Sequence, residues 1–128
     1  MPAPQGLPPG RKALVVDDDE DLREVMRALL TRAGCRVIEA GSGAAGIALF
    51  EQERPDLVIL DVNLPDATGY DVCRRLRAGD RSTPILLCSV RSNDASLGES
   101  LAAGANGYIV KPFESAAFLN SVALALRL

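Results

Sequence analysis

The sequence predicts an α/β fold in which helices cover both faces of a five-stranded parallel sheet. Short aliphatic runs alternate five times with segments whose apolar residues follow helical spacing. The run LVILD at residues 57–61 is apolar on both faces, as a central parallel strand between two helix layers must be. Right-handed crossovers then favour one parallel sheet.

The first half of the chain begins this alternation. Residues 13–17 (ALVVD) predict the first strand, and the apolar positions within residues 22–30 recur at helical spacing, which predicts an amphipathic helix. Residues 36–40 (RVIEA) predict the second strand. Ser42 is a candidate N-cap for a helix that Pro55 ends, although two internal glycines weaken the helical pattern.

The second half repeats strand and helix after the turn-rich segment NLPDATG. The expected elements are, in order, a helix at residues 70–76, a strand at 84–89 (PILLCS), a helix around Leu97 and Leu101, a strand at 107–110 (GYIV) and a helix at 118–126. The five strands and five helices complete the predicted architecture.

Length and composition describe one small domain. A chain of 128 residues can bury one hydrophobic core. Residues 1–11 contain four prolines and lack the apolar segment of a signal peptide, so we expect a disordered lead before a domain at 12–128. No run approaches the roughly 18 apolar residues of a membrane span. Three widely spaced cysteines favour a reducing compartment, so we expect a soluble cytoplasmic protein.

Charge and composition also exclude functions. A net charge of −3 and a pI near 4.9 provide no basic surface for nucleic acid or an anionic membrane. The chain has no histidine, which excludes histidine-based acid–base catalysis and a phosphohistidine on this chain. Any phosphoryl group would therefore come from a donor elsewhere.

Acidic residues cluster where the first and third predicted strands end. VVDDDE places four consecutive carboxylates at residues 17–20, and the third strand ends at Asp61. Two charges about 4 Å apart repel by roughly 4 kcal/mol at an effective dielectric of 20, so this crowding requires solvent, a helix start or a cation. Asp19 and Glu20 suit a helix start. If the strand order is 2-1-3-4-5, the first and third strands are neighbours and Asp17, Asp18 and Asp61 converge, with oxygens that suit Mg²⁺.

The same edge has the groups that phosphoryl transfer requires. Asp61 is a possible phosphoryl acceptor, and Lys111, after the fifth strand, could supply a cation. Ser89 ends the fourth strand. Taken singly, Asp61 could be a surface turn residue and Ser89 a loop cap, but their joint position at strand ends favours a phosphoryl-transfer site.

Four motifs carry a resemblance to a known family. VVDDDE, LVILDVNLPDATGYDV, PILLCS and AGANGYIVKPF, in this order and spacing, resemble the receiver domain of two-component response regulators over roughly residues 12–128. The resemblance implies a flavodoxin-like (βα)5 sandwich with the strand order given above. It also implies a phosphorylation-activated switch that accepts its phosphoryl group from a histidine kinase or histidine phosphotransfer protein.

The resemblance implies further properties of such a switch. It would phosphorylate and dephosphorylate itself without turning over an independent substrate, and would therefore not be an enzyme in the usual sense. Its partners would be the phosphodonor and a downstream effector protein or output domain, and phosphorylation could drive homodimer formation. Direct binding of nucleic acid or membrane is not expected.

The resemblance assigns the metal and acceptor roles to four residues. Asp61 matches the phospho-accepting aspartate and also contacts the metal. Asp18 matches the direct carboxylate ligand of Mg²⁺, for which Mn²⁺ can substitute, and Asp17 matches the ligand that acts through water. Asn63 matches the position whose backbone carbonyl binds the metal.

Other matched positions concern catalysis and switching. Lys111 matches the lysine that contacts the acceptor carboxylate and later the phosphoryl group, and its bond to Pro112 matches a cis peptide. Ser89 matches the hydroxyl that turns to the phosphoryl oxygen, and Tyr108 matches the aromatic switch. Val90 stands where the family usually has a smaller residue, from which we expect an altered rate.

Two other function classes are alternatives. A haloacid-dehalogenase-like phosphatase also uses an aspartate nucleophile and Mg²⁺, but typically shows D-x-D, whereas Val62 and Asn63 follow Asp61 here. A pseudo-receiver that binds partners without phosphorylation would have lost an acceptor, metal or lysine position. All of those positions are filled in this chain.

Overall fold

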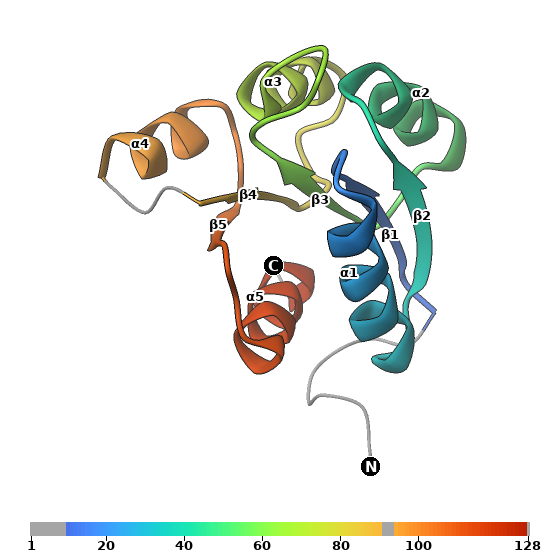
Figure 1. Ribbon diagram of the computed structural model, residues 1–128. Coiled ribbons are helices and arrows are strands. Elements are labelled where there is room, and N and C mark those ends of the chain that lie inside the picture. Colours follow the sequence, from blue (N-terminus) through green and yellow to red (C-terminus); the bar gives the residue numbers. More distant parts are fainter. Residues whose placement is uncertain (1–9, 91–93, 128) are drawn as a thin grey trace.

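A five-stranded parallel sheet lies between two helix layers (Figure 1). The computed structural model describes residues 10–90 and 94–127, so most of the predicted lead lies outside the described residues. The elements are β1 (Lys12–Val16), α1 (Glu20–Arg32), β2 (Arg36–Ala40), α2 (Gly43–Glu53), β3 (Leu57–Asp61), α3 (Gly69–Gly79), β4 (Ile85–Ser89), α4 (Asp94–Ala102), β5 (Gly107–Val110) and α5 (Ser115–Arg127). The strand order β2-β1-β3-β4-β5, with parallel pairing throughout, confirms the predicted fold class.

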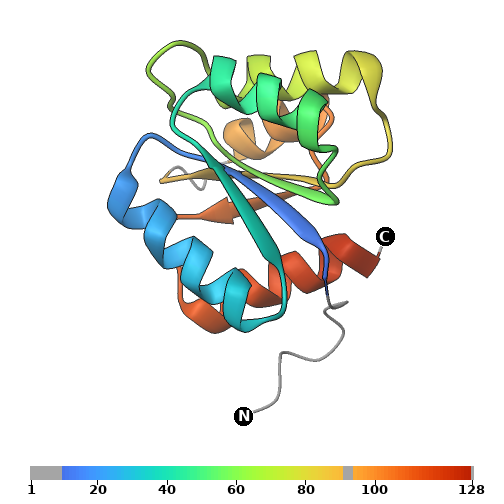
Figure 2. The same cartoon turned by 90° about the vertical axis from the view of Figure 1, so that its right-hand side faces the viewer.

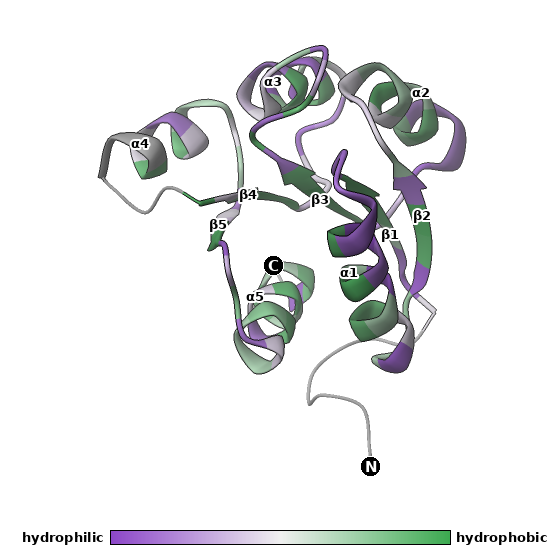
Figure 3. Cartoon of the chain, viewed as in Figure 1, coloured by the Kyte–Doolittle hydropathy of each residue, from purple (hydrophilic) through white to green (hydrophobic). Residues whose placement is uncertain are grey.

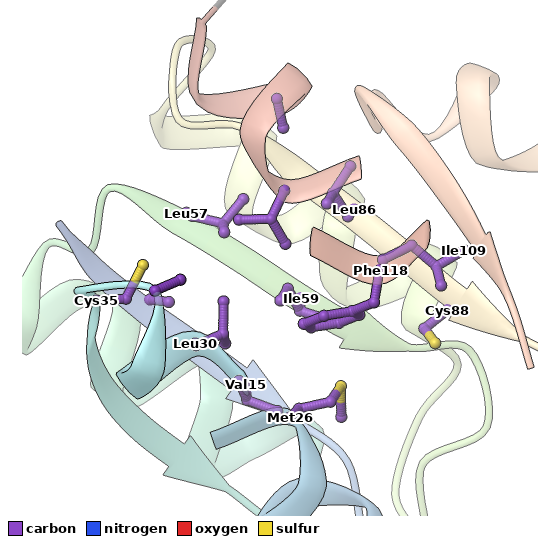
Figure 4. Close-up of a cluster of buried hydrophobic side chains, with 14 of the residues drawn as sticks. Val15, Met26, Leu30, Cys35, Leu57, Ile59, Leu86, Cys88, Ile109 and Phe118 are labelled. Carbon is purple, nitrogen blue, oxygen red and sulfur yellow. The ribbon is translucent and has the colours of Figure 1, made fainter. Parts of the chain in front are cut away.

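The two faces of the sheet carry separate hydrophobic clusters. Helices α1 and α5 cover one face and α2 and α3 the other, with α4 on the latter side beside β5 (Figures 1 and 2). Met26, Ile59 and Phe118 belong to the first cluster (Figure 4). Phe50 and Val72 belong to the second. Strand β3 is buried along its whole length, as its apolar sequence predicts.

Helices α1 and α2 begin at capping residues that the sequence indicates, and α2 ends just before Pro55. Asp19 accepts hydrogen bonds from two backbone N–H groups in the first turn of α1, and Ser42 accepts one from α2. Arg54 ends α2 in the left-handed conformation with φ 50°. Gly46 weakens the helical pattern but has a packing role, because a Cβ there would lie 2.9 Å from the Val16 side chain. The glycine therefore lets α2 approach β1 closely.

Helix α4 exists as predicted but presents its leucines to solvent. Leu97 is 45% exposed and Leu101 59% exposed. Among residues 97–105, for which burial is described, the buried ones are Ser100 and, after the helix, Ala103 and Ala105. Across the described part of the chain, no helix has the length and apolar character needed to span a membrane.

Backbone hydrogen bonds continue the sheet beyond its strands at the carboxyl edge, the edge where the parallel strands end. The backbone N–H of Asp17 donates to β2 at 3.0 Å, and that of Val62 donates to β4 at 3.0 Å. The N–H of Lys111 donates to the last residue of β4 at 2.8 Å. These bonds hold the segments after β1, β3 and β5 at one edge, where the start of α1 is hydrophilic (Figure 3).

Candidate functional site

Three carboxylates converge at the carboxyl edge. Asp17 and Asp18 follow β1, and Asp61 is the last residue of β3. One carboxylate oxygen from each lies within 4.8 Å of the others. Asp17 and Asp61 are 1% and 5% exposed, whereas Asp18 is exposed to solvent. The convergence predicted from the strand order is thus confirmed, and we call these three residues the acidic cluster.

Lys111 brings a positive charge into the acidic cluster from the segment after β5. Its Nζ donates hydrogen bonds to Asp61 Oδ1 at 2.7 Å and to Asp17 Oδ2 at 3.1 Å. The peptide bond between Lys111 and Pro112 is cis, as the resemblance implied. Three elements distant in sequence therefore meet in one charged contact.

Burial and neighbouring charges shift the pKa values of Asp61 and Lys111. Burial raises the pKa of Asp61 most strongly, the Lys111 hydrogen bond opposes that effect, and the carboxylates of Asp17 and Asp18 raise the pKa further. The net effect is a raised pKa. Burial acts to lower the pKa of Lys111, but the bonds to Asp61 and Asp17 outweigh it and raise this pKa. Lys111 is thus a cation at neutral pH, in contact with two carboxylates of the cluster.

The segment between β1 and α1 is fixed by several hydrogen bonds to Asp17. Asp17 Oδ1 accepts the backbone N–H of Asp19 at 2.9 Å, and its carbonyl oxygen accepts Arg23 Nη1 at 2.6 Å. Sequence reasoning did not find Arg23. Arg23 and Arg27 lie one helical turn apart, and nothing in the spacing shows which of them reaches back to the loop.

The segment between β3 and α3 is hydrogen-bonded to the start of α2 and packs closely against the end of β3. Asp66 accepts two backbone N–H groups at the start of α2, at 2.8 and 2.9 Å, and these bonds lower the pKa of Asp66. A Cβ at Gly69 would overlap the carbonyl oxygen of Asp61, so the glycine lets α3 begin against the end of β3. Asn63 is exposed in this segment and forms an isolated bridge with Thr68. Asp66 and Gly69 were also missed, because the turn-rich sequence does not reveal tertiary partners.

The other predicted residues lie on β4 and β5. Ser89 ends β4, is 2% exposed and follows Cys88, the register partner of Asp61. Tyr108 in β5 is half-buried against the cluster beneath α2 and α3. Val90 is 67% exposed. The structure thus places Ser89 on the strand next to Asp61 and Tyr108 one strand further away.

The acidic cluster fits a hard divalent cation. Its donors are carboxylate oxygens, the ligand type that Mg²⁺ prefers. Asp18 is open to solvent, which suits a cation that keeps several waters. Burial raises the pKa of Asp61 most, and the carboxylates of Asp17 and Asp18 raise it further, a repulsion that a bound cation would offset. The residues present therefore suit such an ion.

Comparisons with known proteins agree with this arrangement. The response regulator receiver domain family matches residues 13–123. The transcriptional regulatory protein AfsQ1 of Streptomyces coelicolor is 43% identical over 101 residues, which cover 79% of this chain and 44% of that protein. KdpE of Mycobacterium tuberculosis, also a transcriptional regulatory protein, is 38% identical over 114 residues, covering 89% of this chain and 50% of KdpE. The chain thus spans about half the length of these curated relatives.

Solved structures show the same fold. The chemotaxis protein CheY4 of Vibrio cholerae superposes with a TM-score of 0.87 at 31% identity, covering 91% of this chain and 98% of that chain. The BeF3-activated DrrB receiver domain gives 0.83 at 33% identity, with 93% and 99% covered. The fold and the acidic cluster define a receiver domain of two-component signalling.

The chain belongs to the response regulator receiver domain family. This confirms the resemblance of the four motifs and the phosphorylation-switch class of function that it implied. Neither the phosphatase nor the phosphorylation-independent binding module is favoured by these matches.

Proposed function

We propose that Asp61 accepts a phosphoryl group from the phosphohistidine of a histidine kinase or histidine phosphotransfer protein. One observation carries the proposal: Asp61 Oδ1 lies 2.7 Å from Lys111 Nζ within a cluster that also contains Asp17 and Asp18. A nucleophilic carboxylate, a cation beside it and further oxygen ligands are what phosphoryl transfer requires of a protein. In the reaction the donor P–N bond breaks, a P–O bond to Asp61 forms, and the imidazole leaves with the electron pair.

The acidic cluster would hold the metal ion. Asp18, Asp61 and the Asn63 backbone carbonyl would bind Mg²⁺, or Mn²⁺ in its place, and Asp17 would contact it through water. When bound, the ion would neutralise negative charge on the phosphoryl oxygens. Lys111, already charged and in contact with Asp61, would orient the acceptor carboxylate and stabilise the incoming group.

The switch would use the neighbouring strands. Phosphorylation adds roughly −1.5 to −2 charges beside the end of β4, where Ser89 is buried. The Ser89 hydroxyl would turn to a phosphoryl oxygen, and Tyr108, half-buried on β5, would move inward. The surface formed by β4, β5 and their adjoining helices would then change. The exposed Val90, next to Ser89, would alter the rate of phosphorylation.

The same proposal covers domain boundaries and partners. Residues 12–128 would form the receiver domain after a Pro-rich disordered lead at 1–11, in the cytoplasm. The regulators AfsQ1 and KdpE, of which the chain spans about half, support a downstream output domain or effector outside residues 12–128. The net charge of −3 argues against nucleic-acid binding by this domain itself. It would phosphorylate and dephosphorylate itself without an independent substrate, and phosphorylation could drive homodimerisation.

Intact mass spectrometry tests the acceptor. The chain would be incubated with acetyl phosphate and Mg²⁺, alongside Asp61→Asn, an EDTA control and Asp71→Asn, which changes an exposed carboxylate of α3 outside the cluster. We expect one labile phosphoryl adduct in the wild type and in Asp71→Asn, and none with EDTA or Asp61→Asn. An adduct that persists in Asp61→Asn, or none in the wild type, would refute the assignment.

A further inference from the structure

Arg23 reaches from α1 into the segment that carries two residues of the acidic cluster. Its Nη1 donates to the carbonyl oxygen of Asp17 at 2.6 Å, and its side chain is 16% exposed. That carbonyl belongs to the peptide group that joins Asp17 to Asp18. Because a peptide group is planar, holding its oxygen also restricts the direction in which the chain leaves toward Asp18.

Strand β2 holds the guanidinium of Arg23 in place. Glu39 Oε1 accepts Arg23 Nε at 3.3 Å, and Oε2 of the same carboxylate accepts Arg27 Nη1 at 3.4 Å. A Cβ at Gly41 would lie 3.2 Å from Arg23 Nη1, so the glycine leaves room for this side chain. The arginine thus links β2, the start of α1 and the acidic cluster.

The other polar groups of Asp17 are fixed by different partners. Its N–H donates to β2, Oδ1 accepts the N–H of Asp19, and Oδ2 accepts Lys111 Nζ. These contacts fix the Asp17 side chain, whereas the Arg23 bond acts on the peptide that leads to Asp18. Groups outside the ligand shell that orient metal ligands commonly change metal affinity when removed.

We propose that Arg23 is a positioning residue, which sets the direction in which Asp18 presents its carboxylate by holding the Asp17 carbonyl, with Glu39 holding Arg23. This inference rests on the proposed metal-dependent function. Positioning and simple electrostatics predict opposite signs for the loss of Arg23. Removing a cation near three carboxylates should tighten Mg²⁺ binding by Coulomb's law, whereas losing the alignment of Asp18 should weaken it.

Arg27 provides a matched control. Both arginines lie on α1 and pair with Glu39, and Arg23→Met and Arg27→Met each remove one positive charge. Arg23 bonds to the Asp17 carbonyl, whereas Arg27 pairs with carboxylates at the surface. Arg23→Lys retains the charge, but one ammonium cannot reproduce the separate contacts of Nε and Nη1.

Calorimetric titration of the full chain with Mg²⁺ is the decisive measurement. We expect Arg23→Met to weaken Mg²⁺ binding by about tenfold, Arg27→Met to change it by less than about twofold, and Arg23→Lys to lie between. In the acetyl phosphate reaction, the Mg²⁺ concentration for half-maximal rate should rise by the same factor. The rate at saturating Mg²⁺ should stay within about threefold of wild type, because the metal then restores the alignment.

The affinity of Arg23→Met for Mg²⁺ tests the positioning role of Arg23, and the behaviour of the wild type tests the proposed metal-dependent function. Wild-type or tighter Mg²⁺ affinity in Arg23→Met, while the wild type binds Mg²⁺ and is phosphorylated, overturns the positioning role. A wild type that neither binds Mg²⁺ nor is phosphorylated overturns the proposed function. Thermal unfolding without Mg²⁺ shows whether each variant is folded. If Arg23→Met is unfolded, Arg23→Lys decides: about threefold weaker binding supports the role, and wild-type affinity overturns it.

Discussion

Acidic side chains lie at both edges of the sheet, but they meet different neighbours. At the amino edge, where the strands begin, Asp56 accepts the N–H of the first residue of β1 at 2.9 Å. Asp80 accepts the backbone N–H groups of Ser82 and Thr83, each at 2.9 Å, and also their hydroxyls. At the carboxyl edge, the three carboxylates of the acidic cluster lie close to one another, and the Lys111 ammonium contacts two of them.

The pKa shifts of the two edges follow this difference. Hydrogen bonds, first that from the Thr83 N–H, lower the pKa of Asp80 to about 2. Burial, reinforced by its neighbours Asp17 and Asp18, raises the pKa of Asp61 despite Lys111. A carboxylate surrounded by donors stabilises the fold, whereas carboxylates that face one another favour binding of an additional cation.

Removing Lys111 should produce the largest effect on stability. Lys111→Met leaves the buried Asp17 and Asp61 without their ammonium, and breaking such a buried pair costs about 3 kcal/mol. Lys12→Met, which removes a more exposed pair with Glu53, should cost less than about 1 kcal/mol. Urea unfolding without Mg²⁺ measures both. Equal losses would mean that the acidic cluster does not depend on its ammonium.

Replacing Asp80 tests the amino edge, with a smaller effect. Asp80→Ala leaves the N–H groups of Ser82 and Thr83 without their acceptor, and we expect a loss of about 1 to 2 kcal/mol in the free energy of unfolding. Asp71→Ala, at an exposed pair with Arg74, should change stability by less than about 0.5 kcal/mol. Phosphorylation with acetyl phosphate should remain normal in both. A slowed reaction in Asp80→Ala would show that the edges are coupled.

Replacing Asp18 should stabilise the metal-free protein, whereas the replacements of Lys111 and Asp80 destabilise it. Asp18→Asn removes one of three mutually repelling carboxylates at an exposed position, so the metal-free protein should gain about 0.5 to 1 kcal/mol. The wild type should gain about 1.4 kcal/mol when Mg²⁺ is present at ten times its Kd, and Asp18→Asn much less. Thermal unfolding with and without Mg²⁺ measures both effects. Destabilisation of metal-free Asp18→Asn would show that the cluster is not strained by repulsion.

The arrangement of the sheet could be predicted because local patterns and chain topology agree. Aliphatic runs locate the strands, caps such as Asp19 and Ser42 locate helix starts, and right-handed crossovers favour one parallel sheet. The convergence of the acidic cluster followed, since β1 and β3 are neighbours. Leu97 and Leu101 show the limit: their spacing predicts a helix but does not show whether another element covers them.

The polar contacts of Arg23 and Asp66 could not be predicted, because they depend on tertiary distances that sequence spacing does not contain. Arg23 and Arg27 are equivalent in the helical pattern, yet Arg23 bonds to the Asp17 carbonyl. Asp66 lies in a turn-rich segment, but its donors belong to α2, about twenty residues earlier. Asp80 differs, because its donors lie only two and three residues further along the chain, in a local turn that the Asp-x-Ser-Thr sequence allows.

The smallest expected effect is on the pH dependence of stability. In metal-free protein, this dependence should differ between Asp80 at the amino edge and Asp61 at the carboxyl edge. Asp80 has a lowered folded pKa, so its contribution is complete above its ordinary value of 3.8 and is lost as the pH falls through about 2. Asp80→Asn should therefore be less stable than wild type at neutral pH, by about 1 kcal/mol or less, and should approach it in acid.

Asp61 has a raised folded pKa, so its ionisation reduces stability as the pH rises through that value. Asp61→Asn should then exceed wild type at neutral pH and approach it below 3.8. Urea unfolding between about pH 7 and 2.5 measures both differences. If both variants deviate from wild type in the same direction at neutral pH, the two edges do not differ as their hydrogen bonds indicate.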